Sequence, residues 1–260
     1  MCTLSLVIDR ASGVDRASGD SPSRDQDYLL AMNRDERIAR GPGKLPELHE
    51  IGGVRALYPS DGEGGTWIAA NEIGITLALL NWNQPVPRSL TQPKSRGALI
   101  PALLSMQSLG QMQAAVERLD LGAVKPFRLV GVFGVERAVE EWRWDAHALE
   151  QSNHEWKSQH WFSSSLGDDE ASRFRSTVCS EALKQPGAGS AAWLRGLHAS
   201  HGPQPAYGIC VHREEVRTLS YTEILCTPER TVMTHSIGNP CTPGEPHTAQ
   251  LPRVAALRRS

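Results

Sequence analysis

The second residue of the chain is a cysteine, which could act as a nucleophile without a partner side chain. Cys2 directly follows Met1, and its small side chain permits removal of the initiator methionine. Cys2 would then carry both a thiol with a pKa of about 8.5 and an α-amine with a pKa of about 7.7–8.0, so the amine could take the thiol proton near neutral pH. Alternatively, Cys2 is only the first residue of a strand. The residues that surround it must indicate which of these two roles it has.

Two segments predict where Cys2 lies. Segment 2–8 alternates apolar and polar side chains as a strand does, and a second apolar segment begins at Tyr28. If the two form an antiparallel hairpin in which Ile8 pairs with Tyr28, Cys2 lies opposite Arg34 to within about two residues. We therefore expect Cys2 beside the polar residues that end the second strand.

Those polar residues are Asn33-Arg34-Asp35-Glu36. Because side chains alternate along a strand, Asn33 and Asp35 would face one side of the sheet, Arg34 and Glu36 would face the other, and only one pair can meet Cys2. Charged groups there could orient the α-amine, steady a thiolate or hold a substrate carboxylate. The alternative is a structural ion-pair cluster that ties the strands together.

A second predicted hairpin, with residues 71–74 as its turn, brings Gly64-Gly65 opposite Asn81. Glycine N–H groups can approach a ligand closely, and an asparagine side chain can donate to an oxyanion. Trp67 and Trp82 could wall such a pocket, or they could be core residues.

The remaining pattern predicts one domain over residues 1–260, with a low-complexity, exposed insertion at about 9–26. Periodicity and turn residues predict helices at 95–107, 109–119 and 169–183, and further strands at 54–58, 66–70, 74–82, 127–133, 139–144, 207–211, 218–224 and 231–236.

The composition limits the classes of partner. With 27 Lys and Arg against 29 Asp and Glu, the chain has no excess positive charge for nucleic acid, and it has no apolar run long enough to enter a membrane. No secretory signal is visible, and five widely spaced cysteines suit free thiols, so we expect a cytoplasmic protein that meets a small molecule in a pocket. The sequence does not specify an oligomeric state.

Few histidine and cysteine residues are spaced along the chain as metal ligands are. His198 with His201 and Cys210 with His212 are the close pairings, and neither forms a recognised metal or haem motif. We therefore expect no metal and no cofactor.

Several motifs, taken in order along the chain, resemble the NRDE family, which is also called the transport and Golgi organisation 2 family. The resemblance rests on Met1-Cys2, Asn33-Arg34-Asp35-Glu36, Gly64-Gly65-Thr66-Trp67, Asn81, Ser95-Arg96-Gly97, Tyr207-Gly208 and Tyr221-Thr222-Glu223. It implies an α+β fold like that of the N-terminal-nucleophile hydrolases, a four-layer αββα sandwich with two antiparallel sheets.

In cysteine members of that superfamily the N-terminal cysteine attacks an amide carbonyl, and Cys2 is the matching position. A later asparagine helps to form the oxyanion hole, and Asn81 is the candidate here. These enzymes usually carry an arginine and an aspartate three residues apart on the second strand, whereas Arg34 and Asp35 are adjacent.

The expected function is thus hydrolysis of a small acyl-amide. Cys2, Asn33, Arg34, Asp35 and Asn81 are the expected catalytic residues, and Glu36, Gly64, Gly65, Thr66, Trp67 and Trp82 are the expected substrate-binding residues. Since eukaryotic members are linked to secretion, haem movement and lipid or acyl-CoA metabolism, the alternative that the resemblance allows is a non-catalytic carrier or chaperone for haem, acyl-CoA or a lipid in the same cleft. A third alternative is a polar cluster with a purely structural role.

Overall fold

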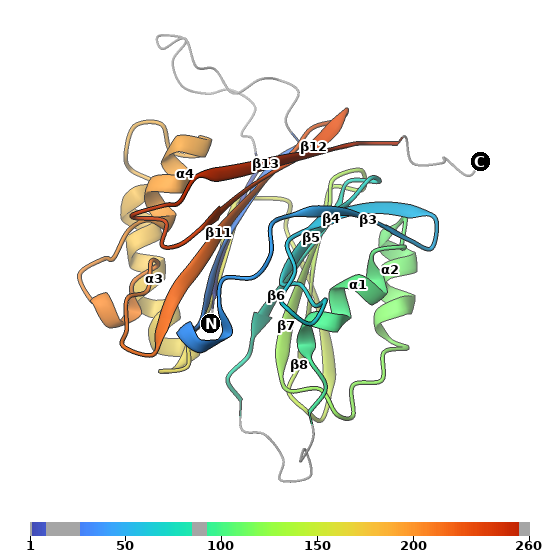
Figure 1. Ribbon diagram of the computed structural model, residues 1–260, viewed down its shortest axis with the longest axis horizontal. Coiled ribbons are helices and arrows are strands. Elements are labelled where there is room, and N and C mark those ends of the chain that lie inside the picture. The colour runs from blue at the N-terminus through green and yellow to red at the C-terminus, as the bar shows by residue number, and fades with distance from the viewer. Residues whose placement is uncertain (1, 9–26, 85–92, 255–260) are drawn as a thin grey trace.

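The computed structural model describes residues 2–8, 27–84 and 93–254 (Figure 1). Met1 and the predicted insertion at 9–26 lie outside the described residues. The described part forms two antiparallel sheets.

The first sheet, called sheet A, carries Cys2. Its strand order is β10 (Gln159–Ser163), β1 (Cys2–Val7), β2 (Tyr28–Arg37), β11 (Val216–Cys226), β12 (Arg230–Ile237) and β13 (Pro246–Pro252). The strands nearest the two ends of the chain thus share one sheet, and β1 has a neighbour on each side.

The second sheet, called sheet B, is a meander in sequence order. It contains β3 (Glu47–Ile51), β4 (Val54–Tyr58), β5 (Ile68–Asn71), β6 (Ile75–Asn81), β7 (Phe127–Phe133), β8 (Ala138–Trp144) and β9 (Leu149–His154).

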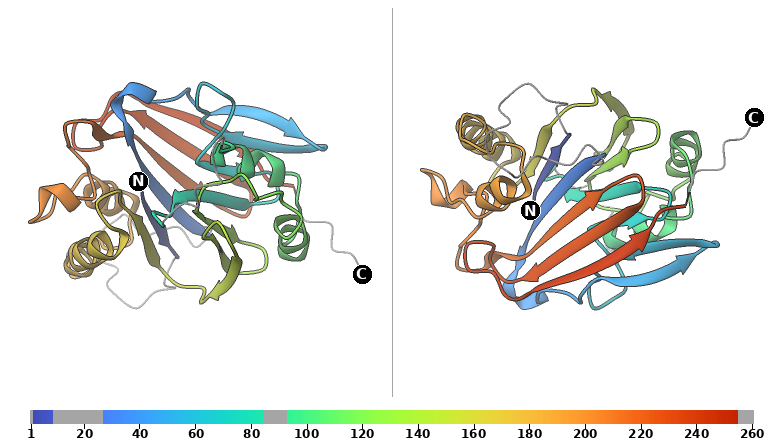
Figure 2. Two further views of the ribbon diagram at one scale, coloured as in Figure 1. Left: turned by 90° about the horizontal axis from the view of Figure 1, so that it is seen from below. Right: turned by 90° about the horizontal axis from the view of Figure 1, so that it is seen from above.

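Helices cover the outer faces of both sheets, so the molecule has four layers (Figures 1 and 2). The helices are α1 (Leu99–Leu103) and α2 (Leu109–Val116) on sheet B, α3 (Asp168–Ala182) and α4 (Ala191–His198) on sheet A, and the 3-10 turns Ile38–Arg40, Arg96–Ala98 and Pro205–Tyr207. Within the described residues no helix has the length and apolar character needed to cross a membrane.

Three apolar cores follow from the alternation of side chains along the strands. Leu4, Leu6 and Leu30 lie between the sheets, whereas Val7 and Leu29 point outward toward α3 and α4. A third core joins the outer face of sheet B to α1 and α2.

Polar contacts also join the two sheets. Tyr28 of sheet A donates to the carbonyl of Gly74 over 3.2 Å, and its hydroxyl lies 2.6 Å from that of Thr76 in sheet B. The buried tyrosine hydroxyl is therefore satisfied by the facing sheet.

The predicted register of the first hairpin is confirmed. Cys2 pairs with Arg34 and Leu6 pairs with Leu30. The second hairpin follows its predicted register too, since Ile68 pairs with Ala78 and the N–H of Leu79 donates to the carbonyl of Trp67.

The structure corrects several elements expected from the sequence. Segment 207–211 is predicted to be a strand, but a 3-10 turn at Pro205–Tyr207 leads into an irregular stretch held by a hydrogen bond from Cys210 N–H to the carbonyl of Ser200. The predicted helix 95–107 is shorter and becomes the turn Arg96–Ala98 followed by α1. Strands β3, β9, β10 and β13, and helix α4, have no counterpart among the predicted elements.

Candidate functional site

A cavity of about 320 Å³ opens beside Cys2, where sheets A and B meet. It is bounded by the ends of β1, β2 and β6, the loop before β5 and the segment before α1. The residues that line it are Cys2, Arg34, Asp35, Glu36, Arg40, Asp61, Glu63, Thr66, Trp67, Leu79, Asn81, Pro93, Lys94, Ser95, Arg96, Gly97 and Lys125.

Cys2 lines this cavity and is only 6% exposed. Burial raises the pKa of its thiol, and the nearby carboxylates of Asp35 and Glu36 act in the same direction, whereas a backbone hydrogen bond from Asp35 lowers it. The thiol therefore needs a base or a cation to become a thiolate near neutral pH.

Two arginines supply positive charge close to the thiol. Arg34 lies opposite Cys2, its guanidinium carbon is 4.5 Å from the centre of the Trp67 ring, and its Nη1 donates to the carbonyl of Gly41 over 2.9 Å. Burial lowers the pKa of Arg34, while the negative charges of Glu36 and an ionised Cys2 raise it. Arg34 is thus held in place by stacking and by a hydrogen bond.

Arg96 is the second arginine, and it enters from the 3-10 turn before α1. Its Nη1 donates to the carbonyl of Pro126 over 2.9 Å. Burial lowers its pKa, and the charges of Glu36 and Cys2 act on it in the opposite direction, as they do for Arg34. The Ser95-Arg96-Gly97 motif is the signal that could have added Arg96 to the expected site residues.

Asp35 lines the cavity, but its carboxylate is anchored toward the helices. Its Oδ1 accepts a hydrogen bond of 2.6 Å from Thr218, and its Oδ2 lies 3.7 Å from Nη2 of Arg175. Burial raises the pKa of Asp35, whereas the Arg175 charge and the Thr218 hydrogen bond lower it. The carboxylate of Asp35 therefore lies on the face of β2 that is turned toward the helices.

Arg175 is a fully buried residue that sequence reasoning missed. Its Nη1 donates to the carbonyl of Cys2 over 3.1 Å and to the hydroxyl of Thr3 over 3.0 Å. Its burial could have been predicted from helical periodicity, because Arg175 lies on the same buried stripe of α3 as Ala171 and Cys179. A charged residue in such a stripe requires a buried partner.

Asn33 is expected in the site, but the structure turns its side chain away from the cavity. Its Nδ2 donates to the carbonyls of His198 and Ile209, each over 2.9 Å, and its Oδ1 lies 3.0 Å from Nδ1 of His198. Since Asn33 is one residue from Arg34, strand alternation directs it to the helix layer. Its role is to hold the end of α4 and the 209–211 segment against β2.

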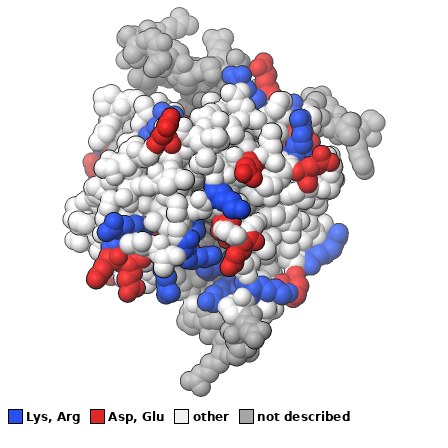
Figure 3. All heavy atoms as spheres, viewed as in Figure 1, with Lys and Arg blue, Asp and Glu red and all other residues white. Residues whose placement is uncertain are grey.

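Acidic residues stand at the mouth of the cavity. Glu36 and Arg40 form an ion pair of 3.2 Å, and Asp61 lies 3.8 Å from Arg40. Positive and negative side chains are interspersed over the face shown in Figure 3, so no field of a single sign covers it. The cavity lining mixes charges in the same way, since it holds five basic residues (Arg34, Arg40, Lys94, Arg96 and Lys125) and four acidic residues (Asp35, Glu36, Asp61 and Glu63).

Three of the residues expected from the second hairpin line the cavity, namely Thr66, Trp67 and Asn81. Asn81 is the last residue of β6, and alternation along the strand places its side chain on the same face as that of Leu79, which also lines the cavity.

Gly64, Gly65 and Trp82, the other residues expected from the second hairpin, are not among the residues that line this cavity. The N–H groups of Gly64 and Gly65 donate to Asp61, and that of Thr66 donates to the carbonyl of Gly97, so the two glycines do not supply oxyanion donors. Gly65 also packs tightly, since a Cβ there would lie 3.0 Å from the backbone of Gly97. Trp82 lies under Arg143, whose guanidinium carbon is 5.9 Å from the ring centre.

Comparison with protein families matches residues 17–177 to the family described as transport and Golgi organisation 2. This match covers more than half of the chain. The chain belongs to the transport and Golgi organisation 2 family. The resemblance inferred from the motifs is therefore confirmed, whereas a search of curated protein sequences gives no match.

Solved structures place this family member in a known fold. Penicillin V acylase from Agrobacterium tumefaciens is 13% identical, with a TM-score of 0.52 over 93% of this chain and 84% of the acylase. A variant of conjugated bile acid hydrolase from Clostridium perfringens is 9% identical, with a TM-score of 0.49 over 99% of each chain. The acylase likeness, with the two antiparallel sheets and their helix layers, shows the N-terminal-nucleophile hydrolase fold that the motifs implied.

Proposed function

We propose that this family member hydrolyses the amide bond of a small, negatively charged N-acyl compound, with Cys2 as the nucleophile. The observation that carries the proposal is the position of Cys2, which lines a cavity beside the guanidinium groups of Arg34 and Arg96. The fold shared with an acylase supports the same reaction class.

The reaction requires removal of Met1, which frees the α-amine of Cys2 to act as the base. The amine takes the thiol proton as Sγ bonds to the amide carbonyl carbon. The carbon–nitrogen bond then breaks, and the proton leaves with the amine product. Water attacks the resulting thioester, which releases the carboxylic acid and restores the thiol.

The cavity supplies the other requirements of this reaction. The amide of Asn81 is the candidate donor to the oxyanion, because the glycine N–H groups are already used. Arg34 and Arg96 are suited to a substrate carboxylate, since guanidinium groups bind carboxylates through two parallel hydrogen bonds. A volume of about 320 Å³ limits the bound part to a small molecule.

The test begins with the intact mass of the purified protein, which must show that Met1 is absent. The processed protein is then assayed against a panel of N-acyl amides with and without a carboxylate. We expect release of the amine from carboxylate-bearing members and loss of turnover in Cys2→Ala. Cys179→Ala is the matched control, because Cys179 is a buried thiol of α3 outside the cavity and its variant should keep full activity.

Retention of Met1, or equal turnover by wild type and Cys2→Ala, would overturn the proposal. A carrier is the specific alternative, because Lys125, and Arg40 and Lys94 if they exchange their ion pairs with Glu36 and Asp120, could bind the phosphates of acyl-CoA. Calorimetric titration with acyl-CoA and with haem distinguishes the two. Tight binding by wild type and Cys2→Ala alike, with no product formed, would identify a carrier and not a hydrolase.

A further inference from the structure

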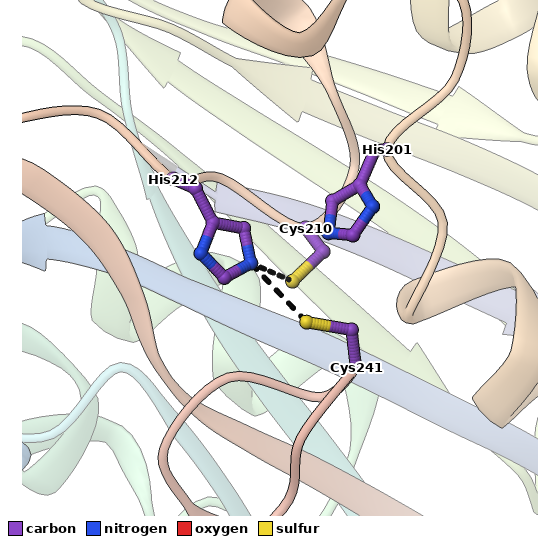
Figure 4. Close-up of side chains that lie close together, drawn as sticks. All are labelled: His201, Cys210, His212 and Cys241. Carbon is purple, nitrogen blue, oxygen red and sulfur yellow. Dashed lines mark hydrogen bonds between the residues drawn. The ribbon is translucent and has the colours of Figure 1, made fainter.

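Four side chains with metal-binding atoms meet on the outer side of sheet A (Figure 4), and none of them lines the cavity. His201 follows α4, Cys210 and His212 flank one residue of the irregular segment before β11, and Cys241 belongs to the loop between β12 and β13. The connection between α4 and β11 and the loop between β12 and β13 therefore place two imidazoles and two thiols together.

The distances suit a single ion. The ligand atoms of the four residues all lie within 4.8 Å of one another. Nε2 of His212 is 3.3 Å from Sγ of Cys210 and 3.2 Å from Sγ of Cys241. A tetrahedral zinc ion with ordinary bond lengths separates its sulfur and nitrogen ligands by about 3.6 Å, so shifts of about 1 Å or less complete the geometry.

We propose that His201, Cys210, His212 and Cys241 bind one Zn²⁺ in a closed, four-coordinate structural site. Two thiolates and two neutral imidazoles are a common ligand set for structural zinc, and with two sulfur ligands they favour zinc over the hard cations Mg²⁺ and Ca²⁺. Both thiols lose their protons to solvent on binding, so the two thiolates balance the charge of the ion. With all four positions filled by protein, no position remains for a substrate.

The zinc site would stabilise segment 209–211, which packs against the end of β2 on the face opposite Cys2. The carbonyl of Ile209 accepts from Asn33, and the N–H of Val211 donates to Thr218 over 2.8 Å, while Thr218 in turn donates to Asp35. Cys210 and His212 therefore lie next to the two residues, Ile209 and Val211, whose backbone groups hold the end of β2. Zinc would fix this segment to α4 and to the β12–β13 loop.

Only half of this site was visible in the sequence. Cys210 and His212 are two residues apart and so share one side of an extended segment, but a pair alone is no motif. His201 and Cys241 join them only through the fold, and the ring centres of His201 and His212 lie 5.0 Å apart. The expectation of no metal rested on the spacing of residues along the chain, which does not report such contacts.

The experiment uses the full chain without a histidine tag, purified under a reducing agent. The protein is incubated with Zn²⁺ alone, desalted and analysed for metal and protein. We expect one zinc ion per chain, with release of two protons measured by calorimetry in buffers of different ionisation enthalpy. Replacement by Co²⁺ should give the intense visible bands of tetrahedral cobalt and sulfur-to-cobalt charge transfer.

Variants locate the ligands. Cys241→Ala and His201→Ala should each weaken zinc binding by about tenfold or more, because each removes one of four ligands. Cys179→Ala and His147→Ala are the matched controls and should bind as wild type does, since neither residue belongs to the cluster. His201 is exposed, so its variant tests the proposal even if Cys241→Ala does not fold.

Three results would overturn the proposal: no zinc uptake, equal zinc affinity in the ligand variants and the controls, or a Cys210–Cys241 disulfide in protein kept under a reducing agent. None of these results depends on whether Cys2 is a catalytic residue, so the zinc site and the hydrolase proposal fail separately.

Discussion

Arg175 of α3 and Asp35 of β2 face each other with 3.7 Å between Nη2 and Oδ2, and neither side chain is exposed to solvent. The same guanidinium donates to the carbonyl of Cys2, so one buried side chain joins the helix layer to both strands that carry the candidate site. A buried charge that makes several hydrogen bonds is costly to remove, because its partners stay buried.

We therefore expect Arg175→Met to lower the free energy of unfolding by about 3–5 kcal/mol, since it removes the positive charge that opposes Asp35. The double variant Arg175→Met/Asp35→Asn should recover part of this loss, because it also removes the negative charge of Asp35, which would otherwise stay buried without its partner. Urea denaturation of wild type, both single variants and the double variant measures the coupling. Strictly additive losses would contradict a direct interaction.

Gly65 gives a second prediction, on packing. A Cβ at Gly65 would lie 3.0 Å from the backbone of Gly97, so Gly65→Ala should lower stability by about 1–3 kcal/mol. Gly196 is the matched control, because it lies within α4 and a Cβ there meets no atom within 4 Å. Gly196→Ala should raise stability by up to about 1 kcal/mol in the same thermal denaturation. Equal changes in both variants would show that the Gly65–Gly97 contact is loose.

Arg96 gives a third prediction, on ligand charge. Arg96→Gln should weaken binding of a carboxylate-bearing ligand by about 10–100-fold, because a charge-assisted hydrogen bond is lost, and should leave a neutral analogue almost unaffected. Arg230→Gln serves as the control, since Arg230 is exposed at the start of β12 and does not line the cavity. Calorimetric titration reads the affinity directly, and the same loss for both analogues would contradict a carboxylate partner.

Buried histidines give a fourth prediction, on pH. Burial lowers the pKa of His198 from 6.5 to about 3 and that of His160 and His235 from 6.5 to about 4. Between about pH 6.5 and pH 4 the unfolded chain therefore binds more protons than the folded protein, so stability falls as the pH falls.

The measurement compares wild type with His198→Gln by urea denaturation between about pH 6.5 and pH 5. The wild-type free energy of unfolding should fall more steeply, by up to about 1.4 kcal/mol per pH unit, because only wild type gains a proton at this position on unfolding. Comparing slopes cancels the other titrating groups. Parallel curves would mean that His198 is already protonated in the folded protein.

The central strands could be predicted from the sequence, because buried strands alternate or are continuously apolar, as in β1 and β7. The missed strands β3, β9, β10 and β13 are the four edges of the two sheets. Edge strands are partly exposed and carry polar or proline residues, so β9 has one large apolar residue, Leu149, and β13 begins and ends with proline. The missed helix, α4, has eight residues, as the predicted α2 does, so its length does not account for the omission.

The residues of the candidate site also fall into those that the sequence predicts and those that it does not. The register between Cys2 and Arg34 depends only on adjacent strands, so counting residues was sufficient. Strand alternation predicts that the side chains of Asn33 and Arg34 point to opposite faces of sheet A. It does not predict which of them faces the helices, since that depends on which face of the sheet meets α4. Arg96 and Arg175 come from other elements, and their approach to Cys2 is set by packing between layers.

The position of β1 between β2 and β10 sets an order of events during synthesis of the chain. Because β10 begins at Gln159, β1 gains its second neighbour only after more than half of the protein has been made. An aminopeptidase needs a free, extended N-terminus, whereas Cys2 is buried once the sheet has closed. Under the proposed function, trimming would thus have to precede closure of the sheet, and a chain that folded untrimmed would lack the free α-amine that the proposed reaction uses as its base.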